Sequence, residues 1–489
     1  MNIKRNLKTY IFLTSLMVII ISSCKKLVEI PQPVDSMTTV KVFSTDNQAT
    51  SAMAGVYSIM IHSKAGGSSG YTGFATGLTT LLVSMSANDL IFTSAGAGYY
   101  TYNLNRLSKF ENSSLELWSS AYTTVYNANA VIEGIEASKS EKLHDKVREK
   151  LTAEAKFVRA FSYFYLVNFF GDVPLVMTTD FNKTVNMTRT PKAEVYSQMI
   201  KDLTDAKEGL SEDFSDQSQQ RSRPNKWAVA ALLARVYLYT GDYINAEIQA
   251  NEVINQSGLF GLNEELNDVF LANSKEAIWQ LQQNSNGTQG TATPEGFTLV
   301  QSLGLGNNDP KNPFRLSDEL VNAFEPLDKR KTNWSWSGIA LDGKLTYFPY
   351  KYKVGFHNRT SGDTPTEAYM VLRLAEQYLI RAEARVRGNA QLALAIKDVN
   401  VIRHRAGLDD LPETLTGPEI LSKIEQEKQV EFFAEWGHRW FDLKRTGRAH
   451  DVLSAIPMKQ PWLGDYQLLY PVPISEITTN TKLTQNPGY

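Results

Sequence analysis

Apolar residues recur every three or four positions in several separate blocks of the chain, which is the spacing of one buried helical face. The most regular block predicts a helix whose buried stripe consists of Leu151, Ala155, Val158, Phe161, Tyr165 and Phe169. Gly171 and Pro174 follow this stripe and predict its end, because neither residue continues a helix readily. Helical patterning also predicts helices over residues 45–60, 115–135 and 418–436.

Two segments predict pairs of closely crossing helices. In the first, small and aromatic residues stand where the two helices of a repeat of about 34 residues meet: Ala234, Tyr237, Gly241, Tyr243, Ala246 and Val253. Gly241-Asp242 is the predicted turn of this pair. A looser copy spans residues 371–407, with its turn at Gly388-Asn389. Such pairs stack on one another, because a single pair cannot bury its apolar face.

Two long segments, residues 64–104 and 283–369, combine many small, polar and proline residues with aromatic ones and lack helical spacing. This composition predicts loops. The aromatic content argues against disorder, and long loops in a compact protein are usually functional. Short strands are predicted at Ala277–Leu281 and at residues 345–354.

The N-terminus has the layout of a secretory signal peptide, with basic residues Lys4, Arg5 and Lys8 before an apolar run over residues 10–21. The run is short for a transmembrane helix. Two serines and Cys24 follow the run as in a bacterial lipobox, so residues 1–23 are predicted to be removed and Cys24 to be lipidated. The alternative is an ordinary signal peptide with an incidental Cys.

The remaining chain is predicted to be a lipidated tether over residues 24–36 and a single body over residues 37–489. Its composition, 42% hydrophobic and 21% charged, is that of a globular protein. Removal of residues 1–23 takes away three of the 50 Lys and Arg and none of the 52 Asp and Glu, which leaves a net charge of −5. Nucleic acid is therefore an improbable partner. Cys24 is the one Cys, which excludes an intramolecular disulfide.

Several short motifs occur in an order that is similar to one known family. They comprise Cys24, Ala155-Lys156-Phe157-Val158-Arg159-Ala160, Phe170-Gly171-Asp172-Val173-Pro174-Leu175, Lys226-Trp227-Ala228, Leu233-Ala234-Arg235-Val236-Tyr237-Leu238, Arg373-Leu374-Ala375-Glu376, Arg381-Ala382-Glu383-Ala384, Glu435-Trp436-Gly437-His438-Arg439-Trp440-Phe441-Asp442-Leu443 and Gln485-Asn486-Pro487-Gly488-Tyr489. The mature chain resembles the SusD/RagB family of nutrient-binding outer-membrane lipoproteins of the Bacteroidetes type. Residues 330–489 carry the C-terminal segment typical of that family.

The resemblance implies a mostly α fold, in which about four tetratricopeptide-like helix pairs pack against a loop-rich, ligand-binding half with a few short strands. It implies an outer-membrane location, with a lipid anchor at Cys24 and the body facing the cell exterior. It also implies a SusC-like TonB-dependent β-barrel transporter as partner, an oligosaccharide as the most frequent ligand, and neither catalysis nor a cofactor. A peptide or another nutrient remains the alternative ligand.

Candidate ligand-binding residues come from the two aromatic segments. Pyranose rings stack their C–H faces on flat aromatic side chains, while their hydroxyls need polar partners nearby. The residues that offer this mixture are Asp89, Tyr99, Tyr100, Tyr102, Trp334 and Trp336. The resemblance supports both segments by analogy, because the ligand loops of the family fall at roughly these positions. The competing interpretation is that each aromatic belongs to the core.

Catalytic interpretations are weaker. His438, Arg439 and Asp442 lie close together in sequence, but a structural Arg439–Asp442 ion pair beside packed Trp440 and Phe441 is the favoured interpretation. Gly66-Gly67-Ser68-Ser69-Gly70 fits a nucleophile-elbow pattern without the strand and helix that the motif requires. The six His residues show no spacing typical of metal ligands. A glycoside hydrolase and a scaffold that binds only protein remain alternative hypotheses.

Overall fold

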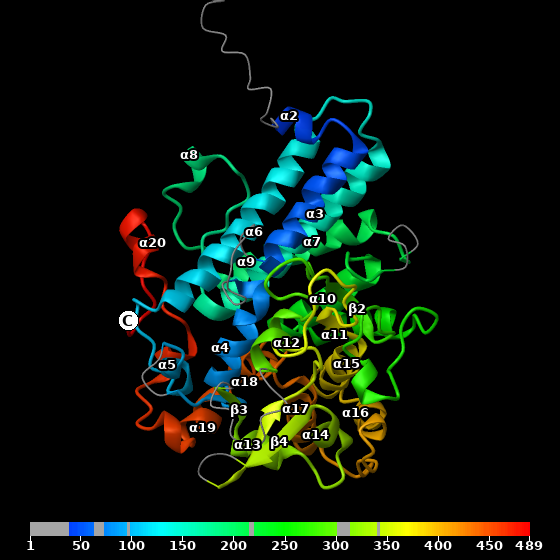
Figure 1. Cartoon of the computed structure of the whole chain (residues 1–489), viewed down its shortest axis with the longest axis vertical. Helices are drawn as coiled ribbons and strands as arrows, with labels where there is room; N and C mark the ends of the chain where they lie inside the picture. Colours follow the sequence, from blue (N-terminus) through cyan, green and yellow to red (C-terminus); the bar gives the residue numbers. More distant parts are fainter. Residues whose placement is uncertain (1–38, 63–72, 95–97, 215–219, 301–312, 340–342) are drawn as a thin grey trace, which may run out of the picture.

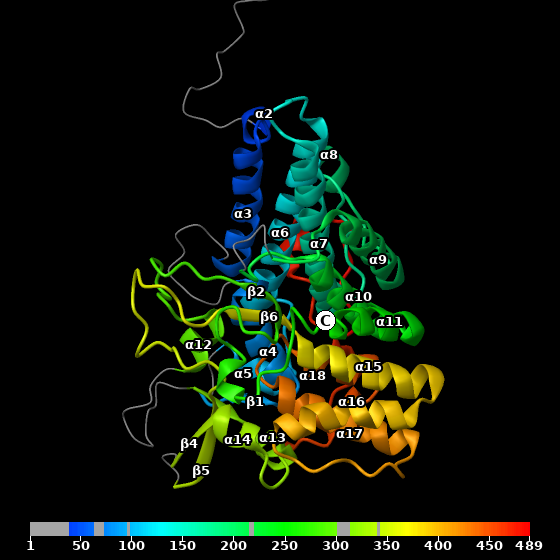
Figure 2. The same cartoon turned by 90° about the vertical axis from the view of Figure 1, so that its right-hand side faces the viewer.

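A computed structural model describes residues 39–62, 73–94, 98–214, 220–300, 313–339 and 343–489. The predicted Cys24, its tether and Gly66–Gly70 therefore lie outside the described residues. The described chain is mostly helical (Figures 1 and 2). Its longer helices are α3 (Asp46–His62), α6 (Asn112–Ala137), α7 (Asp145–Phe170), α9 (Lys192–Gly209), α10 (Lys226–Thr240), α11 (Tyr243–Ile254), α15 (Leu374–Asn389), α16 (Leu392–Arg405) and α17 (Gly417–Phe432).

Consecutive helices pack side by side in one continuous stack. The pairs in contact include α6–α7, α10–α11, α15–α16 and α17 with α18 (His438–Arg445), while α7, α9 and α10 join the first pair to the second and α11 contacts α15. Figure 2 shows α10, α11, α15, α16 and α17 following one another down the molecule. The two helix pairs predicted from sequence thus form part of a longer series.

The first predicted turn is confirmed in detail. Asn225 caps α10 by accepting from the backbone N–H groups of Trp227 and Ala228. Gly241 ends the helix in the left-handed conformation, at φ +79°, which costs glycine little because it has no Cβ. Asp242 then accepts from the N–H of Asn245 and starts α11.

The second predicted turn is displaced. Helix α15 continues through Asn389, and the left-handed residue is Ala390 at φ +50°. The pair also begins later than predicted, because Val371 belongs to strand β6 (Tyr369–Arg373). Helix α17 ends at Phe432, before the predicted limit of 436, because Ala434 and Trp436 adopt positive φ angles that no helix accommodates.

The strands form three two-stranded antiparallel sheets within the described residues. β1 (Leu90–Phe92) pairs with β3 (Phe314–Leu316), β2 (Ala277–Leu281) with β6, and β4 (Ser335–Ile339) with β5 (Leu345–Pro349). The prediction for β2 has the observed bounds. The predicted 345–354 strand is too long, since β5 ends at Pro349, and proline cannot donate to a ladder.

Short helices connect these elements. They are α2 (Thr39–Val42), α4 (Thr79–Ser86), α5 (Tyr100–Asn103), α8 (Phe181–Thr184), α12 (Pro294–Leu299), α13 (Asp318–Ala323), α14 (Lys329–Asn333), α19 (Ala449–Ser454) and α20 (Ile474–Thr479).

The prediction of loops over residues 64–104 is wrong for much of its described part. Residues Phe74–Leu78 form a π-helical turn that leads directly into α4, and every residue of both is buried. The many Ser and Thr residues suggested exposure, but buried hydroxyls can bond to the chain itself, as Thr79 does by donating to the carbonyl of Phe74 at 2.7 Å. This segment therefore belongs to the main core.

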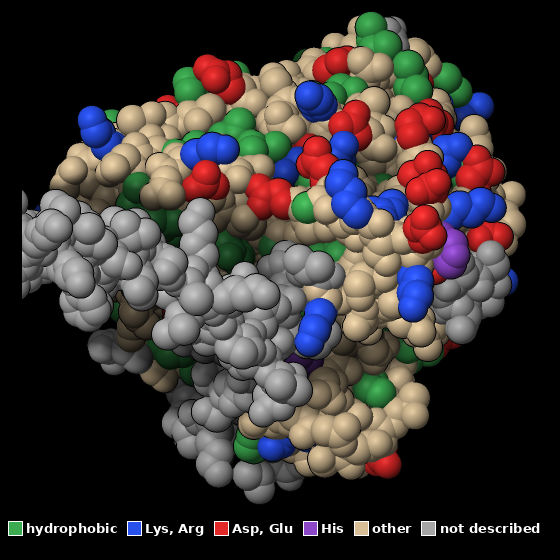
Figure 3. All heavy atoms as spheres, turned by 90° about the horizontal axis from the view of Figure 1, so that it is seen from above, with side chains coloured by type: hydrophobic (Ala, Val, Ile, Leu, Met, Phe, Trp, Pro, Cys, Tyr) green, Lys and Arg blue, Asp and Glu red, His purple; other side chains and the backbone are tan. Residues whose placement is uncertain are grey.

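The surface carries both signs of charge. Seen from above, the described Lys and Arg side chains are interspersed with Asp and Glu over much of the visible face (Figure 3). No described helix is long and apolar enough to cross a membrane.

Candidate functional site

Strand pairing joins the two aromatic segments that are far apart in sequence. β1 and β3 place Phe92 opposite Phe314, with ring centroids 5.2 Å apart. Tyr99 packs edge-on against Phe92 at 5.7 Å, and β3 in turn contacts β5. The two aromatic segments therefore meet through the β1–β3 pair, whose Phe92 and Phe314 are both buried.

The β4–β5 hairpin carries a partly exposed aromatic pair. Trp336 and Phe348 are direct cross-strand partners, with ring centroids 5.3 Å apart and planes inclined by 36°. Both are only half-buried. Tyr347 also lies on the hairpin, where the Lys331 ammonium stands 5.1 Å from its ring centre. Leu345, near the hairpin tip, is 57% exposed.

The structure contradicts the prediction that Trp334 and Tyr102 are ligand-binding residues. Trp334 is fully buried, and its indole N–H donates to the carbonyl of Leu266 at 2.9 Å. Tyr102 is also fully buried and packs edge-on against Tyr470 at 5.4 Å. A ring whose faces are covered by protein cannot stack on a sugar, so both residues are core residues.

The prediction that Asp89 is a ligand-binding residue is also wrong. Its carboxylate is buried, accepts from the Gln429 amide at 3.0 Å and lies 3.6 Å from Nε of Arg439. Burial raises the pKa of Asp89 to about 6, opposed mainly by Arg439. These internal partners leave it no role as a ligand-binding side chain. Tyr99, Tyr100 and Trp336 are partly exposed and remain predictions.

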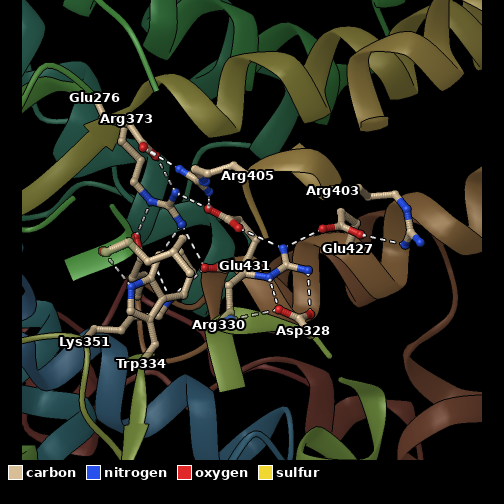
Figure 4. A network of polar contacts seen from close by, with 12 residues as sticks. Glu276, Asp328, Arg330, Trp334, Lys351, Arg373, Arg403, Arg405, Glu427 and Glu431 are labelled. Carbon is tan, nitrogen blue, oxygen red and sulfur yellow. Dashed lines mark hydrogen bonds and ion pairs between the residues drawn. The ribbon is translucent and has the colours of Figure 1, made fainter. Parts of the chain in front are cut away.

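A buried ionic network fastens the base of the hairpin to the helical stack (Figure 4). Arg330, on α14, contacts Asp328 at 2.8 Å and reaches α17 through Glu427 at 2.5 Å and Glu431 at 2.9 Å. Arg373 bonds to Glu431 as well, at 2.5 Å. The network was not predicted, although acidic residues spaced by four on α17 were a visible signal.

Lys351 extends the same network toward the aromatic segment. Its ammonium donates to Glu435 at 2.5 Å and stands 4.7 Å from the ring centre of Trp334. Burial lowers the pKa of Lys351 to about 8, although Glu435 opposes the shift. The buried Trp334 is thus held between cations and core rings instead of facing a ligand.

The predicted Arg439–Asp442 pair is wrong. Asp442 bonds instead to Arg445, one turn further on in α18, at 2.6 Å. Trp440 and Phe441 are buried, as predicted. His438 stacks on Phe432 with centroids 4.6 Å apart, and burial together with neighbouring cations holds its pKa well below the usual range. Each group in this segment therefore has a structural role.

A carboxyl with a strongly shifted pKa lies in α12, within the second aromatic segment. Burial raises the pKa of Glu295 to about 8, reinforced by Glu435 and opposed by hydrogen bonds from Thr80 and Tyr369. Its surroundings are side chains of the core rather than an open cleft. Among the described residues, no group of three or more His, Cys, Asp or Glu is arranged to hold a metal ion.

The stacked helix pairs, with a second half that has few strands and many aromatic residues, define a helical-repeat protein. Comparison with known families shows which family it belongs to. Residues 42–238 match a family described as starch-binding and associating with the outer membrane, and residues 328–489 match the SusD family. The chain belongs to the SusD/RagB family, as its motifs predicted.

Individual relatives agree with this assignment. The SusD-like protein P2 of Formosa agariphila is 29% identical over 415 residues, covering 76% of this chain and 80% of that protein. The starch-binding protein SusD of Bacteroides thetaiotaomicron is 25% identical over 431 residues, covering 72% and 75%.

The fold is shared with solved structures. A SusD superfamily protein from Parabacteroides distasonis superposes with a TM-score of 0.75 at 24% identity, covering 93% of this chain and all of that one. Surface glycan-binding protein A from Bacteroides thetaiotaomicron gives a TM-score of 0.74 at 21% identity, covering 91% and 99%. The predicted mostly helical SusD-like fold is confirmed.

Proposed function

We propose that this protein is a noncatalytic nutrient-binding lipoprotein of the outer membrane. It captures an oligosaccharide at the cell exterior and delivers it to a SusC-like TonB-dependent transporter. Family membership supports this role, as do relatives whose names describe starch or glycan binding. The observation that carries the glycan assignment is the partly exposed Trp336–Phe348 pair on the β4–β5 hairpin.

The chemistry of these side chains suits a sugar. The inclined rings of Trp336 and Phe348 offer an apolar face to pyranose C–H groups, and the partly exposed Tyr99 and Tyr100 add aromatic rings with hydroxyls. The rings are set on a hairpin whose base is fixed by the ionic network, so little ordering accompanies binding.

Affinity electrophoresis of residues 25–489 through gels containing laminarin, starch, xylan or galactomannan tests the proposal. Trp336→Ala should strongly weaken retardation by the polysaccharide that retards the wild type. Phe110→Ala is the matched control, because Phe110 is 72% exposed and its neighbour Lys109 contacts the start of α20 instead of the hairpin.

Each other result has a definite meaning. Equal retardation of wild type and Trp336→Ala would remove the hairpin from the site. Absence of retardation in every gel would contradict the glycan assignment and favour a peptide, whose binding calls for backbone-pairing groups. Release of shorter sugars would contradict the noncatalytic role and favour a hydrolase.

The lipid anchor is tested separately. Cys24→Ser should abolish incorporation of radiolabelled palmitate and release the protein from the membrane fraction, because stable attachment depends on acyl chains. Retention of label in Cys24→Ser would contradict the proposed attachment site.

A further inference from the structure

A groove lies beside α6, on the flank of the molecule and away from the β4–β5 hairpin. Figures 1 and 2 both place α8 near the top and the hairpin at the bottom. The groove is bounded by α6, the segment from Pro174 to Met187 that contains α8, and α20. Its volume of about 470 Å³ falls within the usual range for small-ligand sites.

Aromatic side chains form its floor and rim. Trp118 and Tyr122 pack together in the floor, with ring centroids 4.9 Å apart. Tyr126, one helical turn beyond Tyr122, is 54% exposed, and Phe181 on α8 is 70% exposed. A solvent-facing helix surface normally carries charged residues, so this exposed aromatic concentration is unusual for a surface without a partner.

Polar groups accompany these rings. Ser119 and Thr123 on α6 and Thr479 on α20 line the groove, and their hydroxyls have no hydrogen-bond partner within the described part of the chain. The lining includes one carboxyl, Glu476, and neither Lys nor Arg. Burial raises the pKa of Glu476, opposed by a hydrogen bond from Trp118. The groove is therefore suited to an uncharged ligand rich in hydroxyls.

Hydrogen bonds fix the wall opposite α6. The Tyr122 hydroxyl donates to the carbonyl of Pro174 at 2.8 Å, and the Asn129 amide donates to that of Val176 at 3.0 Å. Glu133 accepts from the backbone N–H of Thr179 at 3.1 Å. On the third side, the Asn480 amide of the chain after α20 donates to the carbonyl of Met187 at 2.8 Å. A site held open in this way loses little conformational entropy on binding.

We propose that this groove is a second saccharide-binding site, which takes a neutral pyranoside between Tyr126 and Phe181. The assignment of a sugar rests on the proposed function. With two separate sites on the body, one long polysaccharide gains avidity by occupying both, whereas a short oligosaccharide occupies one at a time. The groove thereby favours long chains at the cell surface.

The test compares the wild type, Trp336→Ala, Tyr126→Ala/Phe181→Ala and the exposed control Phe110→Ala in the four polysaccharide gels. The groove variant should weaken retardation by the recognised polysaccharide by at least about tenfold, since avidity is lost. Isothermal titration with a short oligosaccharide of that polysaccharide should show one fewer site, with the hairpin affinity unchanged. Tyr126→Phe/Phe181→Trp keeps both rings and should restore retardation.

The outcomes separate the two proposals. Full retardation of the groove variant, with loss in Trp336→Ala, overturns the second site alone. Absence of wild-type retardation in all four gels overturns the proposed function together with the sugar assignment of the groove. Full retardation of the groove variant with loss of co-purification of the transporter would assign the groove to a protein partner. Circular dichroism checks that both replaced residues, being exposed, leave the fold intact.

Discussion

Trp334 and Trp336 lie two positions apart at the start of one hairpin, but Trp334 is buried and Trp336 is partly exposed. In a continuous strand they would share a face. Trp334 instead occupies the end of α14, with φ −108° and ψ 1°, and the strand begins after it. Because Trp334 precedes the strand, it does not follow the alternation of side chains along β4. Its ring points into the core, whereas Trp336 pairs with Phe348.

The two tryptophans should therefore respond differently to truncation. Trp334→Ala is expected to lower the free energy of unfolding by about 3–5 kcal/mol, because it opens a cavity in the core. Trp336→Ala should cost about 1 kcal/mol, mainly the loss of its aromatic partner. Urea unfolding of both variants measures the difference. Equal losses would contradict the distinction between core and surface.

Glu295 makes stability depend on pH. Its pKa in the folded protein is about 8, against an ordinary value of 4.5, so the folded state binds one more proton between these limits. Stability from this group is complete below about pH 4.5 and falls as pH rises through 8, with a slope of at most about 1.4 kcal/mol per unit.

Glu295→Gln should remove that slope, because an amide keeps the shape and does not ionise. The variant is expected to gain stability relative to the wild type between pH 5 and pH 8.5, as measured by urea unfolding at both values. A difference between the two proteins that stays constant with pH would contradict a buried neutral Glu295.

At the scale of elements, the helix pairs depend on turn geometry. Gly241→Ala is expected to lower the unfolding free energy by about 1 kcal/mol, because the added Cβ disfavours φ +79° although no atom obstructs it. Gly55→Ala is the matched control. Gly55 lies inside α3 with equally open space, so Ala should stabilise the protein by about 0.5–1 kcal/mol. Opposite shifts in melting temperature are expected, and shifts of the same sign would contradict this account.

The interruption after α17 has a packing origin. Ala434 and Trp436 adopt positive φ angles. Gly437, directly before α18, has a φ of +78°. A Cβ on Gly437 would lie 2.0 Å from Cγ2 of Val83, so α4 approaches the backbone closely at this point. The turn therefore allows α4, a helix of the first aromatic segment, to pack against the C-terminal helices.

At the scale of the whole molecule, the ionic network holds the loop-rich half, with its short strands, on the helical stack. Arg330→Ala leaves Asp328, Glu427 and Glu431 buried with one cation fewer. The expected loss in unfolding free energy is about 3–5 kcal/mol, since an uncompensated buried charge is costly.

Lys183→Ala is the control for this prediction. Lys183 is 73% exposed and pairs with Asp180 at 3.6 Å, so its removal should change stability by no more than about 0.5 kcal/mol. Chemical denaturation compares the two variants. A small effect of Arg330→Ala would mean that the network does not hold the halves together.

Individual helices and helix pairs could be predicted from the sequence, because the evidence for them is local. The stripe of α7, the stop at Gly171 and the turn at Gly241-Asp242 each depend on neighbours along the chain. The motifs also identified the family. The N-terminal prediction of a lipidated Cys24 lies outside the described residues and stays a prediction.

Which aromatic side chains are exposed could not be predicted from the sequence, because exposure depends on contacts between segments far apart along the chain. Tyr102 packs against Tyr470, and Trp334 is buried beside Lys351. Asp89 accepts a hydrogen bond from Gln429 and lies close to Arg439. Composition cannot distinguish a buried Thr or Tyr from an exposed one, so α4 was predicted as loop. The pairing of β1 with β3, which unites the two aromatic segments, likewise arises from contacts between segments more than two hundred residues apart.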